Sequence, residues 1–64
     1  MRKTNFEVFY PYNSTKDPFL VEIYGSNMNR LVVAYNGEEG IELFWDEKLS
    51  YYKGEVNGIP GFIL

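Results

Sequence analysis

The sequence contains no cysteine and no histidine. Without cysteine, no disulfide can stabilise the fold. Because cysteine and histidine are both absent, a structural zinc site of the usual kind is also excluded. The nucleophile and base pairs of most covalent catalysis also need cysteine or histidine. We therefore expect a protein that is not an enzyme, with no catalytic residues, no metal site and no cofactor.

Long apolar runs and basic residues are also scarce. No run approaches membrane-spanning length, and no apolar segment of a secretory signal follows Arg2 and Lys3. Nine acidic residues outnumber six basic ones, which gives a formal net charge of −3. This balance disfavours nucleic acid as a partner, because lysine and arginine supply most of the affinity for phosphates. We expect a cytoplasmic protein that does not associate with a membrane.

What the chain has in abundance is aromatic residues, with five Phe, six Tyr and one Trp among 64 residues. A chain of this length forms one domain, over residues 1–64, and buries a core of marginal size. Because disulfides and zinc are excluded, dense packing of large rings is the remaining source of stability within the chain.

Short apolar segments separated by turn residues predict a β protein. Asn57-Gly58 lies between two apolar runs and predicts a hairpin with a type I′ turn, in which both central residues need positive φ. Other segments alternate loosely and are bounded by Gly, Pro, Asn and Ser. These patterns predict strands over residues 4–10, 19–24 and 31–35, and turns over 11–18, 25–29 and 36–40.

Residues 41–53 fit two structures. As strands, 41–45 and 49–53 form a hairpin about 46–48, whereas as a helix their apolar residues fall near one face of a 3.6-residue period. We favour strands because aromatic residues are dense and hairpin turns lie on either side. The predicted fold is all-β, a small antiparallel meander or SH3-like barrel of five to six short strands. The alternative is an α+β fold, βββαβ, with a helix at about 41–53.

The last fourteen residues resemble the closing part of eukaryotic SH3 domains, which reads Trp-Trp/Tyr-Lys-x-Glu-Leu-Asn-Gly-x-x-Gly-Phe-Ile-Pro. The matching positions are Tyr51, Tyr52, Lys53, Glu55, Val56, Asn57, Gly58, Gly61, Phe62 and Ile63. Tyr51 replaces the ligand-binding Trp of the family, Leu64 replaces its groove Pro, and the family's Ala-Leu-Tyr-Asp-Tyr run is missing. The resemblance implies a small β-barrel, and proline-peptide binding is not carried over with it.

Side-chain alternation along the predicted strands separates a core from a mixed outer face. The core is predicted to contain Phe6, Val8, Phe19, Val21, Ile23, Leu31, Val33, Ile41, Leu43 and Trp45. The opposite face combines large apolar groups with acids and holds Glu7, Phe9, Leu20, Glu22, Tyr24, Val32, Glu42 and Phe44. Bulges that turn side chains inward, or scattered surface apolar residues, would account for this face without a function. The functional interpretation is that a partner covers it.

We expect a binding protein that docks on a partner protein with a basic surface, because aromatic residues anchor interfaces and rim carboxylates select basic partners. One form of this hypothesis is a phage-type inhibitor covering a basic nucleic-acid-binding surface of a host protein. The predicted partner-binding residues are Glu7, Phe9, Glu22, Tyr24, Glu42 and Phe44.

Three alternatives are kept. The first is an SH3-like peptide-binding module with Tyr51 and Tyr52 at its centre. The second is a single-stranded nucleic-acid-binding barrel that stacks bases on tyrosines; the tyrosines available are Tyr10, Tyr12, Tyr24, Tyr35, Tyr51 and Tyr52. The third is a homo-oligomer formed through the apolar C-terminal edge, residues 62–64, for which closure of a barrel by the last strand is the competing interpretation.

Overall fold

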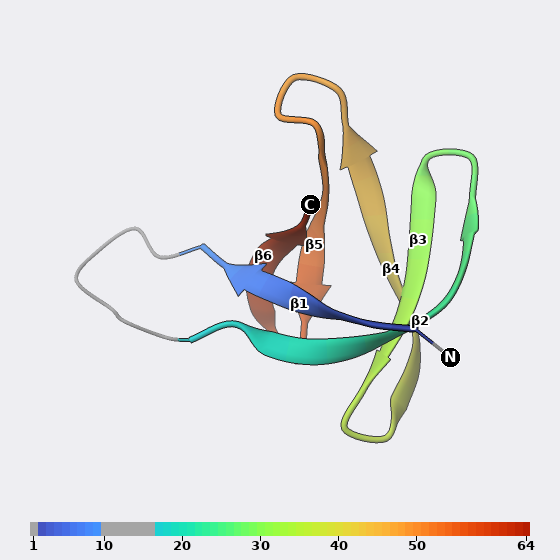
Figure 1. The fold of residues 1–64 in the computed structure, drawn as a ribbon, viewed down its shortest axis with the longest axis vertical. Coiled ribbons are helices and arrows are strands. Elements are labelled where there is room, and N and C mark those ends of the chain that lie inside the picture. The colour runs from blue at the N-terminus through green and yellow to red at the C-terminus, as the bar shows by residue number, and fades with distance from the viewer. Residues whose placement is uncertain (1, 10–16) are drawn as a thin grey trace.

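The computed structural model describes residues 2–9 and 17–64, which form a closed antiparallel β-barrel without a helix. The six strands of this part of the chain are β1 (Arg2–Val8), β2 (Phe19–Asn27), β3 (Arg30–Tyr35), β4 (Glu38–Asp46), β5 (Tyr51–Val56) and β6 (Ile59–Ile63). They follow one another around the barrel in chain order (Figure 1). The predicted small all-β barrel is confirmed.

The barrel is a meander that the first and last strands close. Each strand pairs antiparallel with the next along the chain. The closing seam between β1 and β6 consists of Glu7 opposite Phe62 and Val8 opposite Gly61. β6 is therefore paired on both sides, with β5 and with β1, as expected for a last strand that closes a barrel.

Residues 41–53 lie in β4, β5 and the turn between them, so the helical alternative is wrong. Ile41 and Leu43 are buried while their neighbours are exposed, which is the two-residue period of a strand. The turn is held by the Asp46 carboxylate, which accepts hydrogen bonds from two backbone N–H groups of the turn at 3.0 and 3.1 Å. A hairpin thus satisfies the apolar pattern that a helix would also satisfy.

The three two-residue turns of the barrel depend on positive φ angles. Asn57 and Gly58 have φ of 56° and 75°, and Asn36 and Gly37 have 51° and 85°. Both pairs have the signs that a type I′ turn requires, so the predicted Asn-Gly hairpin is confirmed. The turn between β2 and β3 places Met28 at φ 54° with its side chain 91% exposed. Positive φ is unusual for methionine, since its Cβ is crowded there.

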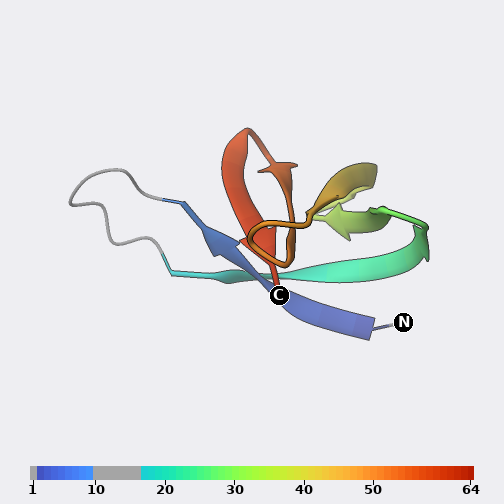
Figure 2. The same ribbon diagram turned by 90° about the horizontal axis from the view of Figure 1, so that it is seen from above.

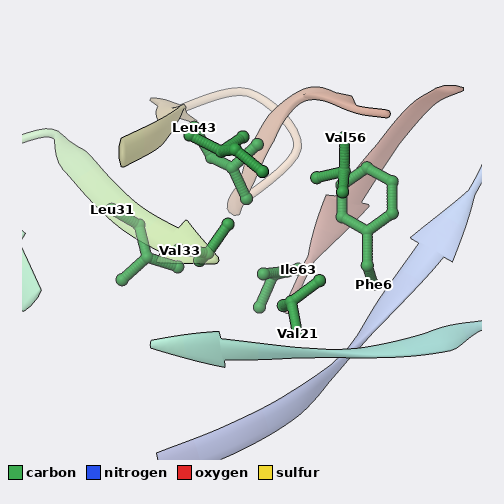
Figure 3. Close-up of a cluster of buried hydrophobic side chains, with 8 residues drawn as sticks. Phe6, Val21, Leu31, Val33, Leu43, Val56 and Ile63 are labelled. Carbon is green, nitrogen blue, oxygen red and sulfur yellow. The ribbon is translucent and has the colours of Figure 1, made fainter. Parts of the chain in front are cut away.

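The core is made by inward-facing side chains of all six strands (Figure 3). The buried apolar residues are Phe6, Val21, Leu31, Val33, Ala34, Ile41, Leu43, Val56 and Ile63. Six of them were predicted, and the predicted Val8, Phe19 and Ile23 pack against them while partly exposed. The prediction for Trp45 is wrong, because its side chain is 38% exposed. Trp45 lies near the end of β4 and packs edge-on against Tyr52, which covers the core.

Two register shifts interrupt the alternation of the central strands. Between β2 and β3 the shift falls at Tyr24, since Ile23 pairs with Val33 whereas Gly25 pairs with Val32. A second shift separates the two ends of the β3–β4 ladder, next to Gly40 at φ 75°. An extra residue on one strand bends it and changes which side chains face inward. Ala34, which alternation places outside, is buried without joining the core cluster, and it lines a shallow hollow with Leu20 and Glu22.

Some predicted boundaries differ from the structure. The first strand, predicted at 4–10, is β1 over Arg2–Val8, and Tyr10 lies outside the described residues. The predicted loop at 11–18 also lies outside them except for Asp17 and Pro18. In the part of the chain that is described, no helix has the length and apolar character needed to cross a membrane.

Candidate protein-binding surface

Three aromatic rings from separate segments meet on the outside of the barrel. The Tyr51 and Phe62 rings are stacked, with centroids 4.5 Å apart and planes inclined by 25°. The Phe9 ring lies 5.1 Å from that of Phe62 and 5.9 Å from that of Tyr51, centroid to centroid. We call Phe9, Tyr51 and Phe62 the aromatic triad. Each pairwise distance lies in the range where aromatic rings attract one another.

The outward direction of the triad rings follows from the burial of the residues next to them in the strands. Ile63 is buried, so the preceding residue, Phe62, points outward from β6. Tyr52 packs against the core, so Tyr51 points outward from β5. Phe9 directly follows β1 and is held beside β6 by donating its backbone N–H to the Pro60 carbonyl at 3.0 Å. All three triad rings remain at least partly exposed to solvent.

The strand register extends this surface around the barrel. Side chains of directly opposite residues in antiparallel strands project from the same face. From β3 to β1 the opposite residues form a continuous line on the outside, the outer row, which consists of Arg30, Phe44, Lys53, Phe62 and Glu7. Cations and rings alternate along the outer row, which ends in a carboxylate next to the triad.

Both cations of the outer row are paired within the chain. Lys53 Nζ lies 2.9 Å from Asp46 Oδ2, and Arg30 Nη1 donates to Glu42 Oε2 at 2.9 Å. The Arg30 guanidinium also lies 5.6 Å from the centre of the Phe44 ring, within cation–π range. The hydrogen bond from Lys53 lowers the pKa of Asp46, and the same contact raises the pKa of Lys53. Each cation of the outer row is thus offset by a carboxylate of the same chain.

Two carboxylates near the triad are not paired in this way. Within the described residues, neither Glu7 nor Glu55 has a basic group within ion-pair distance. Glu7 is opposite Phe62, and Glu55 lies two positions beyond Lys53 on the outer side of β5. The surface around the rings therefore carries negative charge that no group of the described chain neutralises.

The six predicted partner-binding residues all lie outside the core, in two groups. Glu7 and Phe9 lie at the triad, beside the β1–β6 seam. The other four occupy the outer face of β2, β3 and β4, and are Glu22, Tyr24, Glu42 and Phe44. The fold thus separates the predicted set only in part, because the outer row connects Phe44 with Glu7.

Polar groups on the outer face of β2–β4 largely contact one another. Glu42 accepts from Arg30, and the Tyr24 hydroxyl donates to Glu39 Oε2 at 3.4 Å. Partial desolvation, together with the nearby Glu39 carboxylate, raises the pKa of Tyr24. These internal contacts make this face the weaker candidate, although Tyr24 and Phe44 are 45% and 48% exposed.

Tyr51 and Phe62 were not among the predicted partner-binding residues, although they form two thirds of the triad. A prediction that Tyr52 and Ile63 face inward would place Tyr51 and Phe62 on the outer surface, since direct neighbours in a strand face opposite sides. That assignment needed the strands at 51–56 and 59–63, and the predicted strand at 49–53 left its alternation ambiguous.

Across residues 2–9 and 17–64, no group of three or more acidic, histidine or cysteine side chains is arranged to hold a metal ion. The features of this surface are therefore rings, carboxylates and internal ion pairs. Comparison with protein-family models, with curated proteins and with solved structures finds no match to this chain.

Proposed function

We propose that the protein is a non-enzymatic binding protein that docks on a partner protein through the aromatic triad. The observation that carries the proposal is three contiguous rings on the solvent side of a small barrel. Aromatic residues in contact provide large apolar area with little rotamer entropy to lose, which is typical of interface anchors. The bound partner would cover rings that the free protein leaves in water.

The charge around the triad favours a basic partner. Glu7 and Glu55 flank the rings, and Lys53, the cation of the outer row beside Phe62, is paired with Asp46. Lysine or arginine side chains of a partner would pair with these carboxylates and lie against the rings. A specific form of the proposal is a phage-type inhibitor that covers a basic, nucleic-acid-binding surface of a host protein. Small size and negative charge support that form.

The test begins with capture of the partner from a host lysate and its identification by mass spectrometry. The affinity of the purified partner is then measured by calorimetry for the wild type and for Tyr51→Ala, with circular dichroism as a check of folding. Truncating a central aromatic anchor costs about 2 kcal/mol or more, so we expect affinity to fall by at least tenfold. Leu20→Ala is the matched control, since Leu20 is an exposed apolar residue of β2.

Charge reversal provides the second arm of this test. We expect Glu7→Lys to slow association and to reduce its dependence on salt, because rim charges act mainly on the association rate. If the partner binds Tyr51→Ala and Glu7→Lys as tightly as the wild type, the triad is not the interface and the proposal is wrong.

An SH3-like peptide-binding module is the second candidate, and the outward position of Tyr51 in the triad supports it. Tyr51 is the residue that stands where the SH3 family has its ligand-binding Trp. A peptide array distinguishes the candidates, because an SH3-like module prefers proline-containing sequences, whereas the proposed surface prefers basic ones. Absence of any proline preference would remove the SH3-like candidate.

Single-stranded nucleic acid is a less favoured ligand. The triad offers rings for base stacking, but such binding also needs a cationic groove. Arg30 and Lys53, the cations of the outer row, are each paired with a carboxylate. Tyr10 and Tyr12 lie outside the described residues. An electrophoretic shift of oligothymidine at low salt would revive this alternative.

A further inference from the structure

Within the described residues, the N-terminal half of β1 has a free edge. β1 pairs with β2 from Arg2 to Phe6, but in the described part of the chain it pairs with β6 only through Glu7 and Val8. Figure 2 shows this half of β1 continuing past the place where β6 ends. A strand edge with unpaired backbone groups is a template for another strand.

The direction of the unpaired groups follows from the seam. Phe9 donates its N–H to β6, and in a regular strand the N–H and C=O groups point alternately to the two sides. The β1 register has no shift between Arg2 and Phe6 or between Glu7 and Val8. Lys3 and Asn5 therefore direct their N–H and C=O groups toward the β6 side. Beside Lys3 no strand of the described chain is present to pair with them.

A hollow of about 250 Å³ adjoins this edge on the inner side of the barrel wall. It is lined by Arg2, Thr4, Ile23, Ser26, Leu31, Tyr52, Ile63 and Leu64. It is smaller than the roughly 300–1,000 Å³ of common small-molecule sites, and its size suits side chains of a bound segment. Its walls are mixed, because Ile23, Leu31, Ile63 and Leu64 supply aliphatic surface whereas Thr4 and Ser26 supply hydroxyl groups, and Arg2 is its one charged side chain.

We propose that an extended segment of a partner protein adds to β1 here as a strand, antiparallel to β1 and in line with β6. The segment would place an apolar side chain opposite Thr4, inside the hollow, and an acidic side chain opposite Arg2. Main-chain hydrogen bonds to Lys3 give affinity in this mode of recognition, and pockets for alternate side chains give specificity. The site is separate from the aromatic triad, and its partner segment has the opposite charge.

A second copy of this chain fits the edge less well. Pairing β1 with the β1 of another molecule would bring Arg2 and Lys3 of both copies together, and like charges on adjacent strands repel. Thr4 would be the inward residue offered to the hollow, and it is neither large nor apolar. Charge complementarity thus favours a foreign segment with an acidic residue.

The test is a nuclear magnetic resonance titration of the ¹⁵N-labelled full chain with the acetylated, amidated peptide Ile-Thr-Glu-Thr. We expect saturable shifts of the Lys3, Asn5 and Leu64 amides. The same peptide with Lys in place of Glu is the control, and we expect it to bind at least tenfold more weakly. Equal binding of the two peptides, or shifts that avoid these amides, would overturn the proposal.

Two variants test the backbone and the charge separately. Lys3→Pro removes the edge donor, and proline is tolerated where the N–H faces away from the neighbouring strand. We expect it to abolish binding and to leave the spectrum of the barrel intact. Arg2→Glu should reverse the preference between the two peptides, whereas Lys48→Glu, the same charge change in the β4–β5 turn, should not.

The same samples decide between the possible occupants. Diffusion coefficients of the wild type that fall with concentration, and that do not fall for Lys3→Pro, would assign the edge to a second copy and overturn the peptide proposal. Monomeric behaviour at all concentrations, with peptide binding that Lys3→Pro abolishes, supports it. Neither result depends on the aromatic triad, so the two proposals can fail independently.

Discussion

Gly61 is the position where the smallest substitution should have the largest effect on stability. A Cβ at Gly61 would lie 2.6 Å from Cε2 of Phe6 and would also clash with the backbone carbonyl of Glu7. The Phe6 ring is fully buried, and the Glu7 carbonyl belongs to the strand that closes the barrel. Neither group can move without opening the seam, so Gly61→Ala cannot be relieved by a change of rotamer.

The cost can be set from known effects of overpacking. Added methyl groups in packed cores cost typically about 1–3 kcal/mol, and a clash with backbone places Gly61→Ala at the upper end, about 3 kcal/mol. A domain of this length has a total stability of roughly 3–10 kcal/mol, so the loss is a large fraction. With a urea slope near 1 kcal/mol/M, the unfolding midpoint should fall by about 3 M.

Urea unfolding followed by the fluorescence of Trp45 measures this change, with Gly25→Ala as the matched control. Nothing lies within 4 Å of a Cβ built at Gly25, and its φ is not positive. We expect Gly25→Ala to unfold within about 1 kcal/mol of the wild type. A Gly61→Ala midpoint within experimental error of the wild type would refute the reasoning, because the close approach of β6 to β1 would then carry no energetic weight.

Two further predictions concern local features. Met28→Gly should stabilise the protein by about 0.5–1 kcal/mol, because glycine adopts positive φ without the Cβ crowding that methionine suffers. Urea unfolding measures this difference, and equal stability of Met28→Gly and Met28→Ala would contradict the prediction. The lowered pKa of Asp46 means that its carboxylate stabilises the fold above the unfolded pKa, about 3.9, and that this contribution is lost as pH falls through the lower folded value. Asp46→Asn should therefore be less stable than the wild type at pH 7, with the difference shrinking below about pH 4. Parallel curves of stability against pH for the two proteins would show that ionisation of the Asp46 carboxylate does not contribute to stability.

The fold could be predicted from the sequence to the level of strands and hairpins. Local sequence signals predicted the turn at 57–58 and the strands near 19–24 and 31–35. The structure contains these elements because each depends on the backbone geometry of a short segment. The ends of β2 and β4 were misplaced because Gly25 and Gly40 look like turn residues. In the structure they adjoin register shifts, beyond which the strands continue to pair.

The candidate surface could be predicted only in part, for a different reason. Alternation places Phe9 and Phe44 on the outside, and both are exposed. Which outward residues become neighbours depends on the register between strands distant in sequence. Nothing local to Phe9 indicates that Phe62 will lie beside it, because their proximity is created by closure of the barrel. The sequence pattern within one strand therefore cannot predict a surface that forms across the β1–β6 seam.

The β1–β6 seam also implies that the barrel folds in two stages. Every other strand pairing joins elements adjacent in the chain, whereas the one between Glu7 and Phe62 joins residues more than fifty positions apart. Adjacent hairpins can form quickly, while the distant contact must first overcome the entropy of closing a large loop. During synthesis on a ribosome, the pairing of β1 with β6 can therefore form only after β6 has emerged. Until then the Phe9 ring has no Phe62 to pack against, so the nascent chain cannot yet present the aromatic triad.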